Sequence, residues 1–368
     1  ASTDPLPFQM GLPALDLFPR GLWARVMGRR LRTQSRFDLA PGDPGGDPLL
    51  RQAIVEYLRL SRSIDCQPEQ VLITGNYATS MDLILRTLAQ PGQHMWMEDP
   101  GYPFIRPVVE ARQLVVDAIP VDDEGMDVGW GLRHHPQARF ALLTPAHQSP
   151  LGVALSLPRR RQLLAWAAAR DAWIIEDDYD SEFRYHGKPL PPVKSLDAPQ
   201  RVIYAGTFSK SMFPALRTAW LVVPTPLAAR FHQTAERQPC TVPTLWQQTL
   251  ADFIQQGHFW RHLKKMRASY SQRRQWLESA LQAQGFQVTP QQGGIQLVMP
   301  VSGDDRLLAQ RAVAAGLAVQ ALSDWRMRHT GEGGLLMSFT NIRSPAMAGA
   351  LARRLREAIS VGVTPDGA

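Results

Sequence analysis

Short apolar runs alternate with amphipathic stretches between residues 70 and 224 of the chain. Each run is four to six residues long and is bounded by polar or turn-forming residues, which is typical of a buried strand. Because helical patterns separate these runs, the sequence predicts an α/β fold with a mainly parallel, seven-stranded sheet flanked by helices. The expected strands are Val71–Thr74, Met95–Glu98, Leu114–Ile119, Phe140–Thr144, Trp173–Glu176, Arg201–Tyr204 and Ala219–Val223.

Apolar residues recur at helical spacing in most of the remaining stretches. The expected helices cover residues 21–32, 49–60, 80–89, 103–111, 158–170, 226–236, 243–256 and 259–284. The rest of the chain predicts a smaller α+β unit, with strands near 294–298, 318–321 and 335–339 and a helix over 345–359. The last residues, Val361–Ala368, are expected to fray.

The length of the chain favours two closely joined domains. With 368 residues and 44% hydrophobic content, the chain can bury a large core. We predict an N-terminal arm and helix over residues 1–45, a large ligand-binding domain over 46–256 and a small C-terminal domain over 257–368.

The charge and the cysteines exclude several classes of protein. Lys and Arg number 40 against 33 acidic residues, and this excess of 7 favours an arginine bias over a nucleic-acid groove. A plain nucleic-acid-binding protein stays an alternative, which predicts salt-sensitive DNA affinity for this chain alone. Cys66 and Cys240 form no disulfide or metal pattern, so a reducing cytoplasm is favoured. No apolar run approaches the roughly 20 residues of a membrane span, and no secretory leader is recognised.

The most informative stretch follows the sixth expected strand and reads Ala205-Gly206-Thr207-Phe208-Ser209-Lys210. Lys210 is one of only five lysines and would lie at the edge of the sheet, with Arg217 seven places on. This arrangement suits a lysine bound as a Schiff base to pyridoxal 5'-phosphate. Thr207 and Ser209 could bond the phosphate, and Arg217 could neutralise it. Alone, however, a lysine after a strand is more often a solvated turn residue.

Three other strand ends carry residues that fit the same cofactor. Thr74–Ser80 closes a strand and opens a helix, so its backbone N–H groups could hold a phosphate or simply cap the helix. Tyr102 could stack on a pyridine ring or lie at the edge of the core. The acids of Glu176–Asp180 could pair with the ring nitrogen, hold a metal or form a solvated turn. Their coincidence with Lys210 favours the cofactor interpretation.

On these motifs the sequence resembles fold-type I pyridoxal-phosphate proteins of the aspartate aminotransferase kind, over nearly the whole chain. It resembles more closely the effector-binding, aminotransferase-like half of the MocR (GabR-like) transcription regulators. The matching residues are Phe18-Pro19 with Trp23, Gly42–Gly46 with Leu50-Arg51, Glu98–Tyr102, Thr144–Pro150, Glu176–Tyr185 and Thr207–Arg217.

The resemblance implies roles for particular residues of this chain. Lys210 would be the Schiff-base lysine, with Asp177 at the pyridine nitrogen as the second catalytic residue. Asp178 is the alternative if the register slips by one residue. The other implied cofactor contacts are Tyr179 at the ring oxygen, Tyr102 on the ring face, and Ala78, Thr79, Thr207, Ser209 and Arg217 around the phosphate. No metal site is expected.

Departures from the family bear on the function. Aminotransferases of this fold usually carry Asn-Pro-x-Gly where this chain has Ser149-Pro150-Leu151-Gly152. They also bind the substrate carboxylate with an arginine in the strand that here reads Leu335–Phe339, and the GABA-sensing relative has a second such arginine where this chain has Phe104. Leucine and methionine cannot replace a bidentate guanidinium. Arg106 or Arg343 could take over this role.

The sequence therefore predicts the pyridoxal-phosphate-binding, effector-sensing domain of a bacterial MocR-type transcriptional regulator. The effector would be an amine, an amino acid or pyridoxal phosphate itself, and its binding would change domain closure. By resemblance the protein would be a cytoplasmic homodimer that reaches DNA through a winged-helix domain upstream. The start at Ala1, without a methionine, suggests that such a domain was removed. The alternative is a free-standing aminotransferase.

Overall fold

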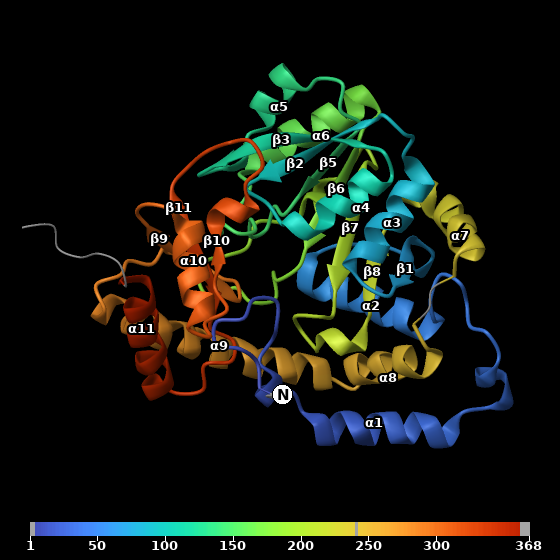
Figure 1. Cartoon of the computed structure of the whole chain (residues 1–368). Coiled ribbons are helices and arrows are strands. Elements are labelled where there is room, and N and C mark those ends of the chain that lie inside the picture. The colour runs from blue at the N-terminus through green and yellow to red at the C-terminus, as the bar shows by residue number, and fades with distance from the viewer. Residues whose placement is uncertain (1–3, 240–241, 361–368) are drawn as a thin grey trace, which may run out of the picture.

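Eight strands form one sheet and three form a second in the computed structural model, which describes residues 4–239 and 242–360 (Figure 1). The expected fraying of Val361–Ala368 and the state of Cys240 lie outside the described residues. The large sheet has the order β1-β8-β7-β6-β5-β2-β3-β4. Its strands are β1 (Val71–Thr74), β2 (His94–Asp99), β3 (Val115–Asp122), β4 (Gly125–Met126), β5 (Phe140–Leu143), β6 (Trp173–Asp178), β7 (Val202–Thr207) and β8 (Ala219–Val222).

The large sheet confirms the predicted α/β architecture. Strands β3, β2, β5, β6 and β7 pair in parallel, whereas β8 runs antiparallel to both β7 and β1. All seven expected strands are present, and the eighth is the two-residue β4, which pairs with the end of β3. Two residues are too few to produce a periodic pattern, so the sequence did not reveal β4.

The end of β6 was predicted two residues too early. The strand continues past Glu176 because Asp177 and Asp178 still pair with Ala205 and Gly206 of β7. Backbone pairing with the neighbouring strand, and not side-chain polarity, determines where this strand ends. Asp177 and Asp178 therefore lie within the strand, where successive side chains point to opposite faces of the sheet.

Helices cover both faces of the large sheet. α3 and α7 pack with β1, β7 and β8 on one face, and α5 and α6 pack with β2, β5 and β6 on the other. The shorter helices α5 and α10 were not predicted. The helices are α1 (Arg20–Thr33), α2 (Pro48–Arg62), α3 (Tyr77–Leu88), α4 (Arg106–Ala111), α5 (Val128–His134), α6 (Leu157–Arg170), α7 (Ala228–Arg237), α8 (Thr244–Gln255), α9 (His258–Ala283), α10 (Asp305–Ala314) and α11 (Pro345–Ser360).

The smaller sheet has the order β10-β11-β9 and is antiparallel. Its strands are β9 (Gln296–Val301), β10 (Gln320–Ala321) and β11 (Gly333–Ser338), and α11 packs beside α9 (Figure 1).

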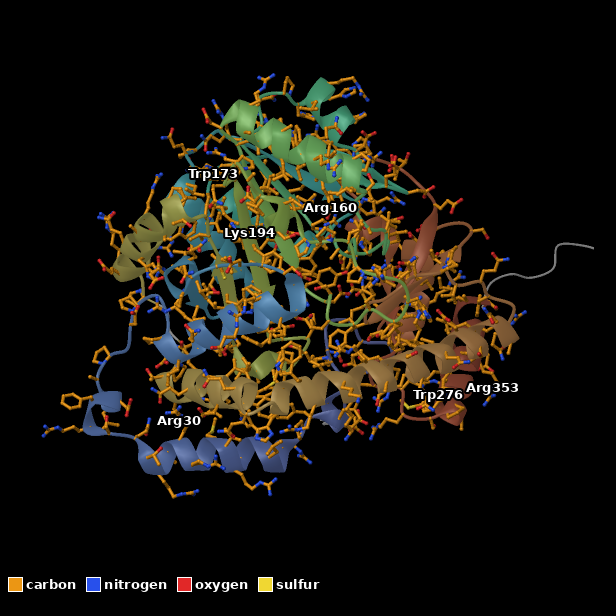
Figure 2. The ribbon with its side chains drawn as sticks, turned by 180° about the vertical axis from the view of Figure 1, so that it is seen from behind. Arg30, Arg160, Trp173, Lys194, Trp276 and Arg353 are labelled. Carbon is orange, nitrogen blue, oxygen red and sulfur yellow. The ribbon has the colours of Figure 1, made fainter. Side chains whose placement is uncertain are left out.

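At the other end of the molecule, α1 is tied to α8 by the two bonds that Arg30 donates to Asp252, at 2.6 and 2.7 Å (Figure 2). The domain boundaries at residues 45 and 256 stay predictions.

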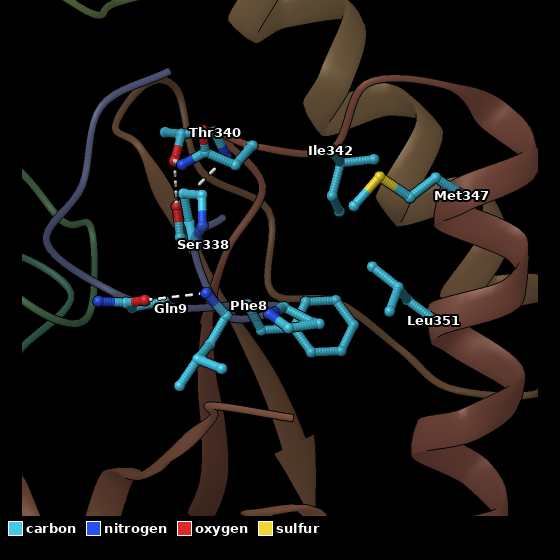
Figure 3. Close-up of a pocket in the computed structure, with 11 residues that line it drawn as sticks. Phe8, Gln9, Ser338, Thr340, Ile342, Met347 and Leu351 are labelled. Atoms are coloured by element: carbon cyan, nitrogen blue, oxygen red, sulfur yellow. Dashed lines mark hydrogen bonds between the residues drawn. The ribbon is translucent and has the colours of Figure 1, made fainter. Parts of the chain in front are cut away.

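The N-terminal arm lies along the smaller sheet before it reaches α1. The carbonyl oxygens of Pro7 and Phe8 accept hydrogen bonds from the amides of Ala318 and Ser338. Figure 3 shows Phe8 beside Ser338 of β11 and Leu351 of α11. The gap between the arm and these elements measures only about 20 Å³, which is room for about one water molecule. The arm is therefore packed against this part of the chain.

Truncating the core between β2 and α6 should destabilise the protein strongly. Trp96 is fully buried, and its ring stacks on Trp166 with centroids 4.1 Å apart. We expect Trp96→Ala to lower the free energy of unfolding by about 3–5 kcal/mol, because the cavity adds to the lost transfer energy. Urea unfolding measures this change. Leu60→Ala, at a side chain 71% exposed, is the control and should change the free energy by less than about 0.5 kcal/mol. Equal effects of both changes would contradict the assigned core.

Candidate functional site

Lys210 lies in the turn after β7, where the N-terminal arm crosses the edge of the large sheet. Its amine donates a hydrogen bond to the carbonyl oxygen of Gly11 at 2.7 Å. Burial lowers the pKa of Lys210 to about 8, against the opposing effect of the Asp180 and Asp177 carboxylates. A larger fraction of this amine than of a free lysine is therefore unprotonated near neutral pH, which favours its action as a nucleophile.

The antiparallel strand β8 brings two other predicted segments to the same edge. Ala219 of β8 lies opposite both Thr74 at the end of β1 and Thr207 at the end of β7. Arg217 lies two residues before the start of this strand, in the left-handed region with a φ of 50°. Its guanidinium is exposed and makes no ion pair within the part of the chain that the structure describes. Thr207 donates from its hydroxyl to Ser209 at 3.0 Å.

The helix N-terminus after β1 supports both interpretations of Thr74–Ser80. The Asn76 side chain accepts from the amide of Thr79 at 2.8 Å, and the Thr79 hydroxyl accepts from the amide of Asn76 at 2.9 Å. This capping box uses the Thr79 side chain. The first-turn N–H groups, those of Tyr77 and Ala78, have no partner within the helix and remain suited to an anion.

Asp177 is a buried carboxylate that the structure leaves without a cationic partner among the described residues. Burial raises its pKa well above the usual range, and the Asp178 and Glu98 charges add to this effect. The hydrogen bond from the Tyr77 hydroxyl lowers the pKa only in part. Such a group is stabilised by a protonated ring nitrogen, so it fits the cofactor that the sequence predicted.

The neighbouring acid, Asp178, already has its partners. Its carboxylate accepts from Arg62 Nε at 3.0 Å and from the Tyr204 hydroxyl. The two acids also point to opposite faces because they are successive residues of β6. The alternative register, with Asp178 at the ring nitrogen, would need this ion pair to break. The geometry therefore favours Asp177.

Two tyrosines predicted for the site lie near these groups. Tyr102 is 40% exposed, and its ring contacts those of Tyr77 and Trp325 with centroids 6.4 and 5.9 Å away. Burial, with a further contribution from the Asp177 charge, raises the pKa of Tyr102. The Tyr179 hydroxyl donates to the carbonyl oxygen of His147 at 3.0 Å. Contact with a cofactor oxygen stays a prediction for Tyr179.

Several residues at the site were not predicted from the sequence. The His147 ring nitrogen Nδ1 lies 3.1 Å from both the Tyr179 hydroxyl and Asp180, and Gly11 contacts Lys210. Tyr77, which bonds Asp177, lies within the predicted phosphate-binding segment Thr74–Ser80, so its position in the sequence could have indicated a role in the site. Nothing in the sequence pattern indicated Gly11, because it lies 199 residues from Lys210.

Glu98 and Asp99 connect β2 to other parts of the fold. Glu98 is buried and accepts from the amide and hydroxyl of Thr144 at 3.0 and 2.7 Å. Burial raises the pKa of Glu98 to about 7, although the Thr144 donors oppose this shift. Asp99 accepts from three backbone amides at 2.7–2.8 Å, those of Met327, Arg328 and His329. Asp99 thus joins the large sheet to the segment before β11.

The strand that lacks an arginine is apolar and buried. Leu335, Leu336 and Met337 of β11 have no exposed surface. Leu336 packs in an apolar cluster whose other members are Val298, Leu322 and Trp325, with Met10 and Leu151 against it. The Arg343 guanidinium lies 3.9 Å from Asp4 and is 54% exposed. The suggested takeover by Arg106 or Arg343 stays untested.

Other site classes find no support in the described part of the chain. Within residues 4–239 and 242–360, no His, Cys, Asp or Glu cluster has the arrangement of a metal site. None of the described helices is long and apolar enough to cross a membrane. Cys66 is a free, buried thiol whose pKa is raised to about 11, mainly by burial.

Comparison with known proteins gives one family match and two kinds of relatives. Residues 29–359 match the sequence model of the family "Aminotransferase class I and II". The probable rhizopine catabolism regulatory protein MocR of Rhizobium meliloti is 33% identical over 94% of this chain and 70% of its own length. The pyridoxine biosynthesis transcriptional regulator PdxR of Corynebacterium glutamicum is 33% identical over 85% of this chain and 68% of its own. The multiple substrate aminotransferase of Thermococcus profundus superimposes with a TM-score of 0.85 at 27% identity, covering 97% of this chain and 92% of that chain.

The lowered pKa of Lys210 should appear in its reactivity. Competitive acetylation with acetic anhydride, read by mass spectrometry, should rise about tenfold per pH unit below pH 8 and level off above it. The internal standard, N-acetyl-lysine amide, should continue to rise to about pH 10.4. A Lys210 profile parallel to that of the standard would show that burial does not depress the pKa of this amine.

Glu98 should make stability fall with rising pH. Its folded-state pKa of about 7 exceeds the usual value of 4.5, so the folded state binds the proton more tightly, and this contribution to stability is lost as pH rises through 7. Relative to wild type, Glu98→Gln should gain roughly 1–3 kcal/mol in unfolding free energy between pH 5 and pH 8. Urea titrations at several pH values measure this, with the exposed Glu236→Gln as control. A pH-independent difference would refute the shift.

Proposed function

The chain belongs to the class I and II aminotransferases and, among them, to the MocR-type transcription regulators, and from this premise we propose that it is a pyridoxal-phosphate-dependent sensor domain. In this proposal Lys210 binds the cofactor, and the effector is either an amine that binds beside the cofactor or the cofactor itself. A DNA-binding domain elsewhere in the regulator responds to this binding. The observation that carries the proposal is the juxtaposition of the half-buried Lys210 amine, whose pKa is lowered, with the buried carboxylate of Asp177, which forms no ion pair among the described residues.

Each residue of the site has a task in this proposal. The amine of Lys210 would hold the cofactor, and Asp177 would keep a proton on the ring nitrogen. When bound, the cofactor supplies an aldehyde that condenses with primary amines and a ring that withdraws electrons. Tyr102 would pack on the ring face, and Tyr179 would donate to the ring oxygen. The phosphate would be held by Ala78, Thr79, Thr207, Ser209 and Arg217.

The apolar surroundings of Leu336 support a sensor over an efficient transaminase. An amino acid substrate needs a guanidinium or comparable donor to orient its carboxylate. Leu336 instead contributes to an apolar cluster that includes Met10, next to the Gly11 that contacts Lys210. We therefore favour an effector that does not depend on a carboxylate clamp, either an amine or pyridoxal phosphate itself. The name of the relative PdxR, a regulator of pyridoxine biosynthesis, supports the second choice.

The N-terminal arm offers a route from the site to DNA. It contacts Lys210 through Gly11 and bonds to β11 through Phe8. The relatives are named as helix-turn-helix regulators, and we propose that a winged-helix domain precedes residue 1 in the same way. A change at Lys210 would then move the arm and with it the DNA-binding domain. We further propose a cytoplasmic homodimer, because exposed groups such as Arg217 and Tyr102 suit a site completed by a second subunit.

A free-standing aminotransferase is the second candidate. It is favoured by the close superposition on the Thermococcus profundus enzyme over 92% of that chain. The two candidates differ in turnover, since a sensor completes at most a half-reaction with its effector.

Lys210→Ala should abolish covalent cofactor binding. Wild-type protein incubated with pyridoxal phosphate should show a visible absorption band, and borohydride should fix one adduct on Lys210, detected by peptide mass spectrometry. The variant should show neither, because no other described residue offers an amine at this position. Lys264→Ala, on an exposed face of α9, is the matched control and should behave as wild type.

The absence of a band and adduct in the wild type would refute the proposed cofactor. Turnover is measured on the same protein with a panel of amino donors and keto acids. Sustained production of keto acid over many cycles would favour the aminotransferase candidate, whereas a single half-reaction or none supports the sensor.

A further inference from the structure

A buried ion network lies directly behind the acidic end of β6. Arg62, the last residue of α2, places Nε 3.0 Å from Asp178 and a terminal nitrogen 3.2 Å from Glu182. The three side chains are only 12%, 5% and 10% exposed. One guanidinium thus joins both ends of the turn that follows Asp177.

Two tyrosine hydroxyls complete this network. Tyr57, on the same helix as Arg62, donates to Glu182 at 2.9 Å, and Tyr204 of β7 donates to Asp178. The Arg62 guanidinium also lies over the Tyr57 ring, 5.7 Å from its centroid. The network therefore connects α2, β6 and β7, and each acid lies against both Arg62 and a tyrosine hydroxyl.

The charge of Arg62 compensates the buried acids. Burial acts to raise the pKa of Asp178, but the Arg62 charge and the Ser181 and Tyr204 donors hold it below its usual range. Asp178 in turn raises the pKa of Asp177. Without Arg62, the buried carboxylates of Asp178 and Glu182 would lie uncompensated, which is strongly unfavourable.

The network binds Asp178 and leaves Asp177 as the acid on the other face of β6. Asp177 and Asp178 both pair with β7, so their side chains project from opposite faces of the strand. As long as Arg62 and Tyr204 hold Asp178 on its face, Asp177 remains on the other. A shift of one residue would have to bury Asp177 against Arg62 and break the bonds of Asp178 and Glu182.

We propose that Arg62 is a positioning residue for the cofactor: by binding Asp178 and Glu182 together, it fixes the register of the acidic turn so that Asp177 alone meets the ring nitrogen. This inference rests on the proposed function, because it assumes that the cofactor occupies the Lys210 site. Arg62 itself does not touch the cofactor in this proposal.

The test is the absorption spectrum of bound pyridoxal phosphate at saturating cofactor. The ring nitrogen and Asp177 share a proton, so an altered register changes the spectrum, whereas a loss of stability alone does not. Arg62→Met should reproduce the spectrum of Asp177→Asn and raise the cofactor dissociation constant at least tenfold. Asp178→Asn should keep the wild-type spectrum, because its amide oxygen still accepts from Arg62 and Tyr204.

Arg30→Met is the matched control, since Arg30 forms a comparable pair with Asp252 between α1 and α8. It should keep the wild-type spectrum. A wild-type spectrum for saturated Arg62→Met would overturn the proposal, and so would an Asp178→Asn spectrum like that of Asp177→Asn. If Arg62→Met does not fold, Arg62→Lys decides: a spectrum between those of wild type and Asp177→Asn supports the proposal, and an unchanged one overturns it.

These results are separable from a failure of the proposed function. If wild-type protein gives no visible band with pyridoxal phosphate, or if Asp177→Asn has the wild-type spectrum, the proposed cofactor role of Lys210 or Asp177 is wrong. The Arg62 comparison bears on its positioning role only when wild-type protein shows a visible band and Asp177→Asn changes that spectrum.

Discussion

The candidate site depends on the backbone pairing of β8 between β1 and β7. Ala219 lies opposite Thr74 on one side and Thr207 on the other, so two loops more than 130 residues apart end at one edge of the sheet. This pairing is fixed by ladder hydrogen bonds and by buried side chains on both faces. It brings the N-terminus of α3 beside the turn that carries Lys210. Every later feature of the site builds on this convergence.

Asp177 and Asp178 are adjacent in the sequence, but only Asp178 has its charge compensated by an ion pair among the described residues. Asp178 is paired with Arg62, whereas Asp177 forms no ion pair within the part of the chain that the structure describes. Lys210 is likewise held with its pKa below that of a free lysine because it is buried. Buried charges without partners are costly in a folded protein. Their presence together at one edge of the sheet is typical of a site that is completed by a ligand.

The arm adds a connection that ordinary packing would not require. The carbonyl oxygens of Pro7 and Phe8 accept hydrogen bonds from the amides of Ala318 and Ser338. The carbonyl oxygen of Gly11 accepts one from Lys210. One short segment thus touches the smaller sheet and the reactive amine. In a regulator, such a segment can couple the state of a ligand site to a domain attached before it, because both contacts must change together. The apolar cluster around Leu336, which includes Met10 of the arm, belongs to the same connection.

The sequence by itself determined the α/β architecture, all strands longer than two residues in the large sheet and the family, because buried runs and strand-end motifs are local signals. It also identified Lys210 and Asp177 as candidates, and the structure places the end of β6, which carries Asp177, beside the end of β7, which Lys210 follows. It did not reveal β4 or the full length of β6, since strand pairing decides these. Only the tertiary structure revealed the contact of Gly11 with Lys210 and the partners of Arg62, and these partners favour Asp177 over Asp178 at the ring nitrogen. These depend on atoms from distant segments, and no periodicity within one segment carries that information.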